Sequence, residues 1–182
     1  MNESLRGGEV RSADAPADTS GIVPELLPVL DRHRQWVASG WEAGKRADLH
    51  GSDLNTANLS GVLLADADLH RADLHYALLA GADLEGADLH RADLHEADMR
   101  DTDLQWADLH DSDLHGANLC GAMLKEADLH RADLHAADLT NAQLGGANLR
   151  DADLRGVRGL TRAQLETATT NNGTLLPPSL RF

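Results

Sequence analysis

Residues 67–100 read ADLHRADLHYALLAGADLEGADLHRADLHEADMR, and this stretch repeats every five residues. The same period runs from residue 47 to residue 156, which makes 22 units without a gap. Leucine holds one position in every unit except the one in which Met99 replaces it. Two residues before it stands alanine in 18 units, and Ser52, Val62, Thr102 or Ser112 in the others. A period of five fits neither an amphipathic helix nor a plain strand.

Within each unit the alternation of residue types predicts a short extended segment. The small residue and the leucine are two positions apart, so they point to the same side, and the acid between them points to the other. A two-residue corner then completes the unit. The predicted core is the column of central apolar residues: Leu49, Leu54, Leu59, Leu64, Leu69, Leu74, Leu79, Leu84, Leu89, Leu94, Met99, Leu104, Leu109, Leu114, Leu119, Leu124, Leu129, Leu134, Leu139, Leu144, Leu149 and Leu154.

A second period of 20 residues indicates how many units make one coil. The blocks that begin at Ala67, Ala87 and Ala127 all open with ADLHRADLH, and the block at Ala107 opens with ADLHDSDLH. We therefore expect residues 20 apart to lie above one another, at about the 4.8 Å spacing of paired strands. Duplication of a 20-residue unit would leave the same pattern in the sequence.

The A[DN]LXX units closely resemble the pentapeptide repeat family. The resemblance covers 110 of the 182 residues. It implies an all-β solenoid, a right-handed quadrilateral β-helix with one unit on each face. Such a solenoid needs caps at both ends.

Both flanks of the repeat carry helical signals. Residues 24–40 predict an amphipathic helix with Pro24 or Pro28 in its first turn. Thr161 is the expected N-cap of a short helix, and the tail after it is expected to be an extended cover strand. The predicted division is a disordered segment at 1–20, a capping helix and linker at 21–46, the β-helix at 47–156, and a short helix with an extended tail at 157–182.

The charge distribution separates the repeats from the rest. The chain carries a net charge of −14, of which the repeats hold −15 and all other residues +1. Such an acidic surface argues against direct binding to nucleic acid. No apolar stretch reaches a membrane-spanning length, residues 1–20 show no signal-peptide pattern, and Cys120 is the only cysteine. We expect a cytoplasmic protein, monomeric or homodimeric, without a membrane partner.

Nine of the ten histidines follow a core leucine. An aspartate stands two residues before each of these histidines, so two adjacent faces are expected to carry parallel rows of Asp and His. A solvated surface explains this pattern, and divalent metal binding or pH sensing are the alternatives. No compact metal motif is present, and we expect no cofactor. The tentative metal ligands form a first column of His50, His70, His90, His110 and His130, and a second of His75, His95, His115 and His135.

A few residues break the repeat with apolar side chains and are candidate partner contacts. Leu63, Leu78 and Met123 occupy outward positions, while Tyr76 and Trp106 occupy corners. Cover by the chain's own leader or tail is the alternative explanation.

No catalytic motif stands out from the repeat, so an enzyme is the least favoured class. The sequence favours a non-catalytic scaffold or protein-interaction module for an unknown partner. The first alternative, by family resemblance, is an acidic DNA mimic that binds or modulates DNA gyrase or another topoisomerase. The second is a metal-binding His/Asp surface.

Overall fold

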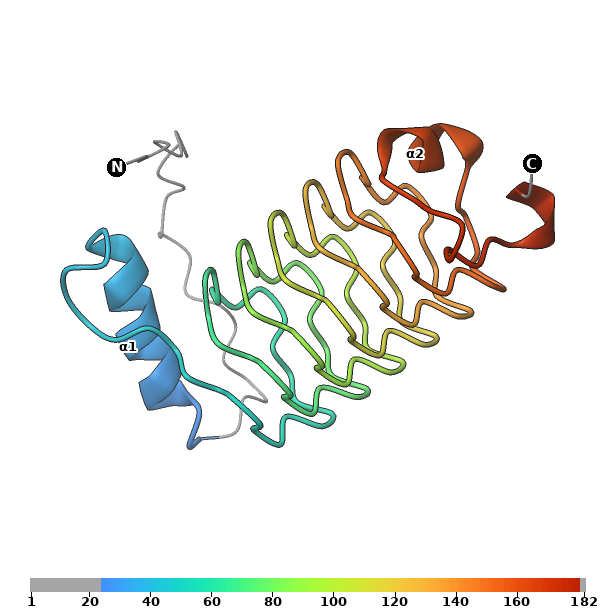
Figure 1. The fold of residues 1–182 in the computed structure, drawn as a ribbon. Coiled ribbons are helices and arrows are strands. Elements are labelled where there is room, and N and C mark those ends of the chain that lie inside the picture. Colours follow the sequence, from blue (N-terminus) through green and yellow to red (C-terminus); the bar gives the residue numbers. More distant parts are fainter. Residues whose placement is uncertain (1–23, 181–182) are drawn as a thin grey trace.

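The computed structural model describes residues 24–180, and the predicted disordered segment 1–20 lies outside them. The chain forms a solenoid between two caps (Figure 1). Its helices are α1 at Leu27–Ala38, α2 at Arg162–Thr167 and the 3-10 helix η1 at Pro178–Leu180. None of the helices in the described range is long and apolar enough to cross a membrane.

The coils pair through single parallel bridges between residues 20 apart. Asp48 bridges Asp68, Asp68 bridges Asp88, and the pattern continues along the repeat. The leucine N–H of one coil donates to the carbonyl of the outward residue in the next, as from Leu49 to Asp68 at 2.7 Å. Each coil is therefore four units long, as the 20-residue period predicts. Isolated bridges are the natural form of such pairing, because each extended segment is too short for a longer ladder.

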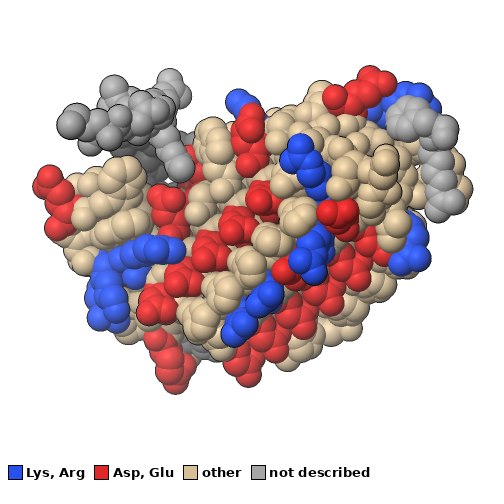
Figure 2. Space-filling model, viewed as in Figure 1, with Lys and Arg blue, Asp and Glu red and all other residues tan. Residues whose placement is uncertain are grey.

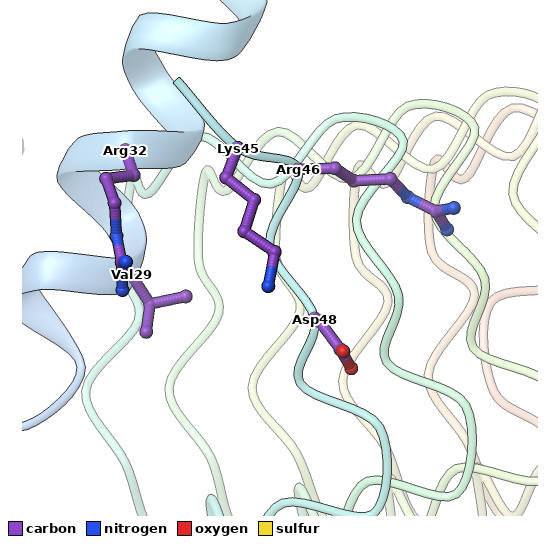
Figure 3. A pocket seen from close by; sticks show the side chains of 5 residues that line it. All are labelled: Val29, Arg32, Lys45, Arg46 and Asp48. Carbon is purple, nitrogen blue, oxygen red and sulfur yellow. The ribbon is translucent and has the colours of Figure 1, made fainter.

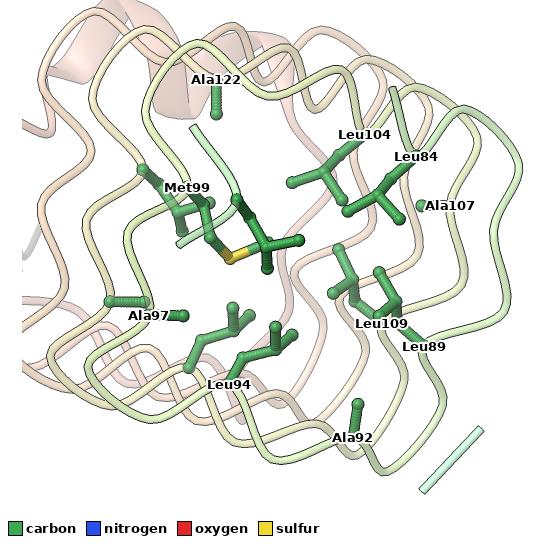
Figure 4. Packing of buried hydrophobic residues seen from close by; sticks show 14 of the residues in the cluster. Leu84, Leu89, Ala92, Leu94, Ala97, Met99, Leu104, Ala107, Leu109 and Ala122 are labelled. Atoms are coloured by element: carbon green, nitrogen blue, oxygen red, sulfur yellow. The ribbon is translucent and has the colours of Figure 1, made fainter. Parts of the chain in front are cut away.

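The interior is filled by stacked leucine and alanine. All 22 central side chains, Met99 included, are at most 4% exposed. Figure 4 shows several of them pointing inward from successive coils. Burying one leucine stabilises the fold by about 1.5–3 kcal/mol. Two buried hydroxyls at the small inward position are satisfied by backbone carbonyls: Thr102 Oγ1 donates to Leu79 at 2.9 Å and Ser112 Oγ to Leu109 at 2.7 Å.

The corners share one backbone conformation that the sequence did not predict. The last residue of every unit has a positive φ, whether or not it is glycine, for example 57° at Tyr76 and 67° at Gly81. The N–H of the following residue donates back to the core leucine, as in the 2.9 Å bond from Ala77 to Leu74. This is the geometry of a type II turn, which requires positive φ at its third residue.

The N-terminal cap is α1, which is shorter than the predicted 24–40. Pro28 lies in its first turn, as expected. Leu30 and His33 are its buried residues, whereas Trp36 and Val37 are only half-buried. The contact with the first coil is thus centred on the first two turns of the helix.

The C-terminal cap begins with the predicted N-cap. Thr161 and Gln164 form a reciprocal capping box at the start of α2. Gln164 Nε2 also donates to the carbonyls of Leu139 and Ala142, at 3.0 and 2.9 Å. Beyond α2 the tail pairs with the last coil through bridges from Asn148 to Thr169 and from Asp153 to Leu175.

Candidate functional site

The outward aspartates have a local structural role as well as a charge. In most units Oδ1 accepts from the backbone N–H of the residue two positions on, as the N–H of His90 donates to Asp88 and that of His110 to Asp108, both at 3.0 Å. Asn58 and Asn118 bond in the same way to Ser60 and Cys120. A side-chain oxygen at this position thus holds the corner in place, which explains why the units accept Asp or Asn there.

The first histidine column is a continuous stack of imidazole rings, but their orientation changes along it. Ring centroids of successive members are 4.8–5.0 Å apart. His50 and His70 are nearly parallel, at 5°, and His70 and His90 are at 21°. His90 and His110 instead meet edge to face, at 74°. The ring planes of the next pair, His110 and His130, are inclined at 52° to each other.

The second histidine column is more regular. His95 stacks on His115 at 5°, and His115 on His135 at 16°. Tyr76 contacts His75 and His95 from the neighbouring corner. Asp73 accepts from His75 at 2.8 Å, which raises the pKa of His75 and lowers that of Asp73. A charged His75 is therefore favoured at a higher pH than for an isolated imidazole.

Basic residues beside the first column pair with aspartates rather than with the histidines. Arg91 and Arg131 both contact Asp111, at 3.6 and 3.2 Å. Figure 2 shows the rows of acidic residues along the solenoid, with basic and neutral residues between them. Exposed ion pairs of this kind contribute about 0–1 kcal/mol each, so they shape the surface potential more than the stability.

Within residues 24–180 three groups bring potential metal ligands within 4.8 Å of one another. The other six tentative histidine ligands belong to none of these groups. The third group lies on a different face and contains no histidine, so the histidine columns did not point to it, although its acids follow the regular spacing. The groups are His90 with Asp108 and His110, Asp73 with His75 and Asp93, and Asp83 with Glu85 and Asp103.

The candidate partner residues do not form one patch. Tyr76 is 51% exposed, Leu78 44% and Trp106 43%. Leu63 and Met123 are half-buried on one face, but Asp83 and Asp103 lie between them in the bridge column. The tail up to residue 180 pairs with the last coil, and the leader helix α1 lies at the other end, against the first coil.

One buried histidine escaped the sequence analysis. His33 of α1 is fully buried, and its Nδ1 accepts the N–H of Ala47, the first residue of the repeat, at 3.0 Å. Burial lowers the pKa of His33, the nearby Ala65 backbone opposes the shift, and the Arg46 charge adds to it. Its spacing from Leu30 and Val37 places His33 on one stripe of the helix, and this helical period is the sequence signal that could have marked it as buried.

A small cavity lies where α1 meets the first coil. It has a volume of about 60 Å³ and is lined by Val29, Arg32, Lys45, Arg46 and Asp48 (Figure 3). Two of its cations already donate to backbone carbonyls, Arg32 to Pro28 at 3.0 Å and Arg46 to Asp66 at 2.5 Å. The cavity is therefore a shallow, mostly basic hollow beside the acidic repeats.

Comparison with solved structures gives pentapeptide repeat proteins. HetL of the cyanobacterium Nostoc sp. strain PCC 7120, involved in heterocyst differentiation regulation, is 34% identical over 73% of this chain, with a TM-score of 0.30. The match spans only 63% of HetL. Rfr23 of Cyanothece 51142 is 28% identical over 71% of this chain and 90% of its own, with a TM-score of 0.33.

A third neighbour is QnrB1, a plasmid-mediated fluoroquinolone resistance protein. It is 19% identical over 74% of this chain and 79% of its own, with a TM-score of 0.35. The comparison with curated proteins gives no significant match.

The family model for pentapeptide repeats matches eight copies in overlapping segments that together extend from residue 45 to residue 169. This range includes all 22 units and continues through α2 to the first tail bridge at Thr169. The chain belongs to the pentapeptide repeat family.

Proposed function

We propose that the chain is a right-handed quadrilateral β-helix that acts as a non-catalytic scaffold for a protein partner. The observation that carries this proposal is the exposure of Tyr76 and Leu78 beside one corner, at 51% and 44%. These side chains interrupt columns whose other members are mostly polar or small. Large apolar groups held on a rigid surface are typical of protein contacts.

The repeat itself supplies mild substitutions for testing this contact. Asp stands at the outward position of 15 units, so Leu78→Asp preserves the backbone pattern and removes the apolar surface. Gln143→Asp introduces the same side chain at another exposed outward position without removing apolar surface, and is the matched control. We expect a stoichiometric partner, captured from a lysate of the source organism, to be lost with Leu78→Asp and kept with Gln143→Asp. Equal capture by both variants would remove Leu78 from the interface.

The acidic rows support a second candidate, a DNA mimic that binds or modulates DNA gyrase or another topoisomerase. Aspartates recur once per coil on neighbouring faces, and the repeats carry a net charge of −15. A supercoiling assay with purified protein tests this candidate directly. If micromolar protein neither inhibits the topoisomerase nor protects it from a poison, this candidate is excluded.

A further inference from the structure

We propose that His90, Asp108 and His110 form a binding site for one divalent transition metal ion. The three side chains come from two successive coils on one face, and their ligand atoms lie within 4.8 Å of one another. All three residues are half-buried. Two imidazoles and a carboxylate form a ligand set suited to Zn²⁺, Ni²⁺ or Cu²⁺. This site goes beyond the proposed scaffold role and does not depend on it.

The ring orientation distinguishes this pair from the other histidines. In a parallel stack, such as His95 on His115 at 5°, the nitrogen lone pairs of the two rings lie in parallel planes and do not converge on one ion. His90 and His110 meet at 74°, which allows a nitrogen of one ring to approach that of the other. Metal binding is therefore expected at one point of the first column rather than along both columns.

The carboxylate of the site is fixed in orientation by the backbone. Asp108 Oδ1 accepts the N–H of His110 at 3.0 Å. This bond ties the third ligand to the same corner that carries the second, so little side-chain freedom is lost when an ion binds. The neighbouring Asp88 and Asp128 add negative charge on both sides of Asp108 in the bridge column.

A chain of hydrogen bonds selects the tautomer of His110. Asp151 Oδ2 lies 3.2 Å from His130 Nε2, and a carboxylate can only accept, so His130 Nε2 carries a proton. In the tautomer with its single proton on Nε2, His130 accepts at Nδ1, which lies 3.2 Å from His110 Nε2. His110 Nε2 therefore donates, and its Nδ1 keeps a free lone pair for a metal. Carboxylates that orient ligand histidines in this way are a general feature of metal sites.

The adjustment needed to bind an ion is small. Tetrahedral Zn²⁺ with bonds of about 2.0–2.1 Å places its ligand atoms roughly 3.4 Å apart. Contracting the site from within 4.8 Å requires shifts of about 1 Å, which side-chain rotation at a half-exposed surface supplies. Arg91, which follows His90 in the sequence, is drawn toward Asp111, and water can complete the coordination.

The test uses the full chain without a polyhistidine tag, with Zn²⁺ competed against a chromophoric chelator and Co²⁺ absorption as a report on geometry. We expect one Zn²⁺ per chain and a tetrahedral Co²⁺ spectrum. His90→Asn or His110→Asn should weaken Zn²⁺ binding by about 100-fold or more. The matched controls His95→Asn and His115→Asn, at the same heights in the second column, should leave binding unchanged. Asp151→Asn should weaken it by about tenfold through His130.

Two results would overturn the proposal. The first is no Zn²⁺ binding by the wild-type chain in the micromolar range. The second is an equal loss of binding in the second-column variants, which would indicate diffuse binding to the histidine surface. Circular dichroism of each variant verifies that the solenoid is intact, so a loss of binding cannot be mistaken for unfolding.

Discussion

Replacing Gly81 by alanine isolates the energetic cost of the positive-φ corner. Gly81 has a φ of 67°, and a Cβ built there has no atom within 4 Å, so no steric clash contributes. Its N–H still donates to the Arg100 carbonyl at 2.8 Å in the variant. An L-residue in the left-handed region costs about 1–2 kcal/mol. Alanine also restricts the unfolded chain, which offsets about 0.4–1 kcal/mol of that cost.

Gly145→Ala is the matched control for this experiment. Gly145 also has open space around its Cβ position, but its φ lies outside the left-handed region. Since the effect on the unfolded chain is the same in both variants, the difference in unfolding free energy between them reports the corner alone. We expect Gly81→Ala to be less stable than Gly145→Ala by about 1–2 kcal/mol. Gly145→Ala itself should be slightly more stable than the wild type.

Urea unfolding followed by circular dichroism measures the difference, with equal m-values as a check that the variants unfold in the same way. Hydrogen exchange at the Gly81 corner provides a local measurement, which matters because repeat proteins can unfold in parts. Equal stability of the two variants would show that inter-coil pairing, rather than residue type, removes the cost of the positive φ. The tolerance of Tyr76 and Arg91 at such corners would then need no energetic compensation elsewhere.

Three further perturbations test the core, the N-terminal cap and the C-terminal cap. Leu104→Ala should destabilise the solenoid by about 3–5 kcal/mol, whereas Leu104→Met should cost less than about 1.5 kcal/mol, as measured by urea unfolding. Burial lowers the pKa of His33 in the folded chain below the value of about 6.5 that it has in the unfolded chain. The unfolded chain therefore binds more protons as the pH falls below about 6.5, and the free energy of unfolding decreases. His33→Gln, whose side-chain oxygen can still accept from Ala47, should lack that contribution in melting curves between pH 7 and 5. A melting curve for His33→Gln that falls as steeply as the wild type would contradict this assignment. Gln164→Ala removes two side-chain hydrogen bonds to the last coil and half of a capping box. Amide hydrogen exchange in α2 should therefore accelerate by about tenfold. Unchanged exchange would refute the capping role.

The repeat made the solenoid predictable because its two periods encode two different geometric facts. The spacing of two between alanine and leucine defines the inward side, and the spacing of 20 defines the bridge partner, as between Asp48 and Asp68. The positive φ of Tyr76 was not predictable from residue preference, since a tyrosine does not favour that region. It follows from the position in the turn, which every unit must adopt to pair with the next coil.

The functional surface was predictable only in outline. Sequence spacing places His90 and His110 above one another, but no spacing determines that their rings meet at 74° whereas His95 and His115 are parallel. That difference depends on side-chain torsions and on neighbours such as Asp111 at the corner. The burial of His33 depends on how a helix without repeats docks on the first coil, which its own sequence does not specify.

The direction of the inter-coil hydrogen bonds has a mechanical consequence. These bonds run along the solenoid axis, so a force that pulls the two ends apart loads them one coil at a time rather than all together. Each released coil frees 20 residues, which extend to about 66–72 Å. Under tension the molecule should therefore lengthen in regular steps at low force, one coil at a time.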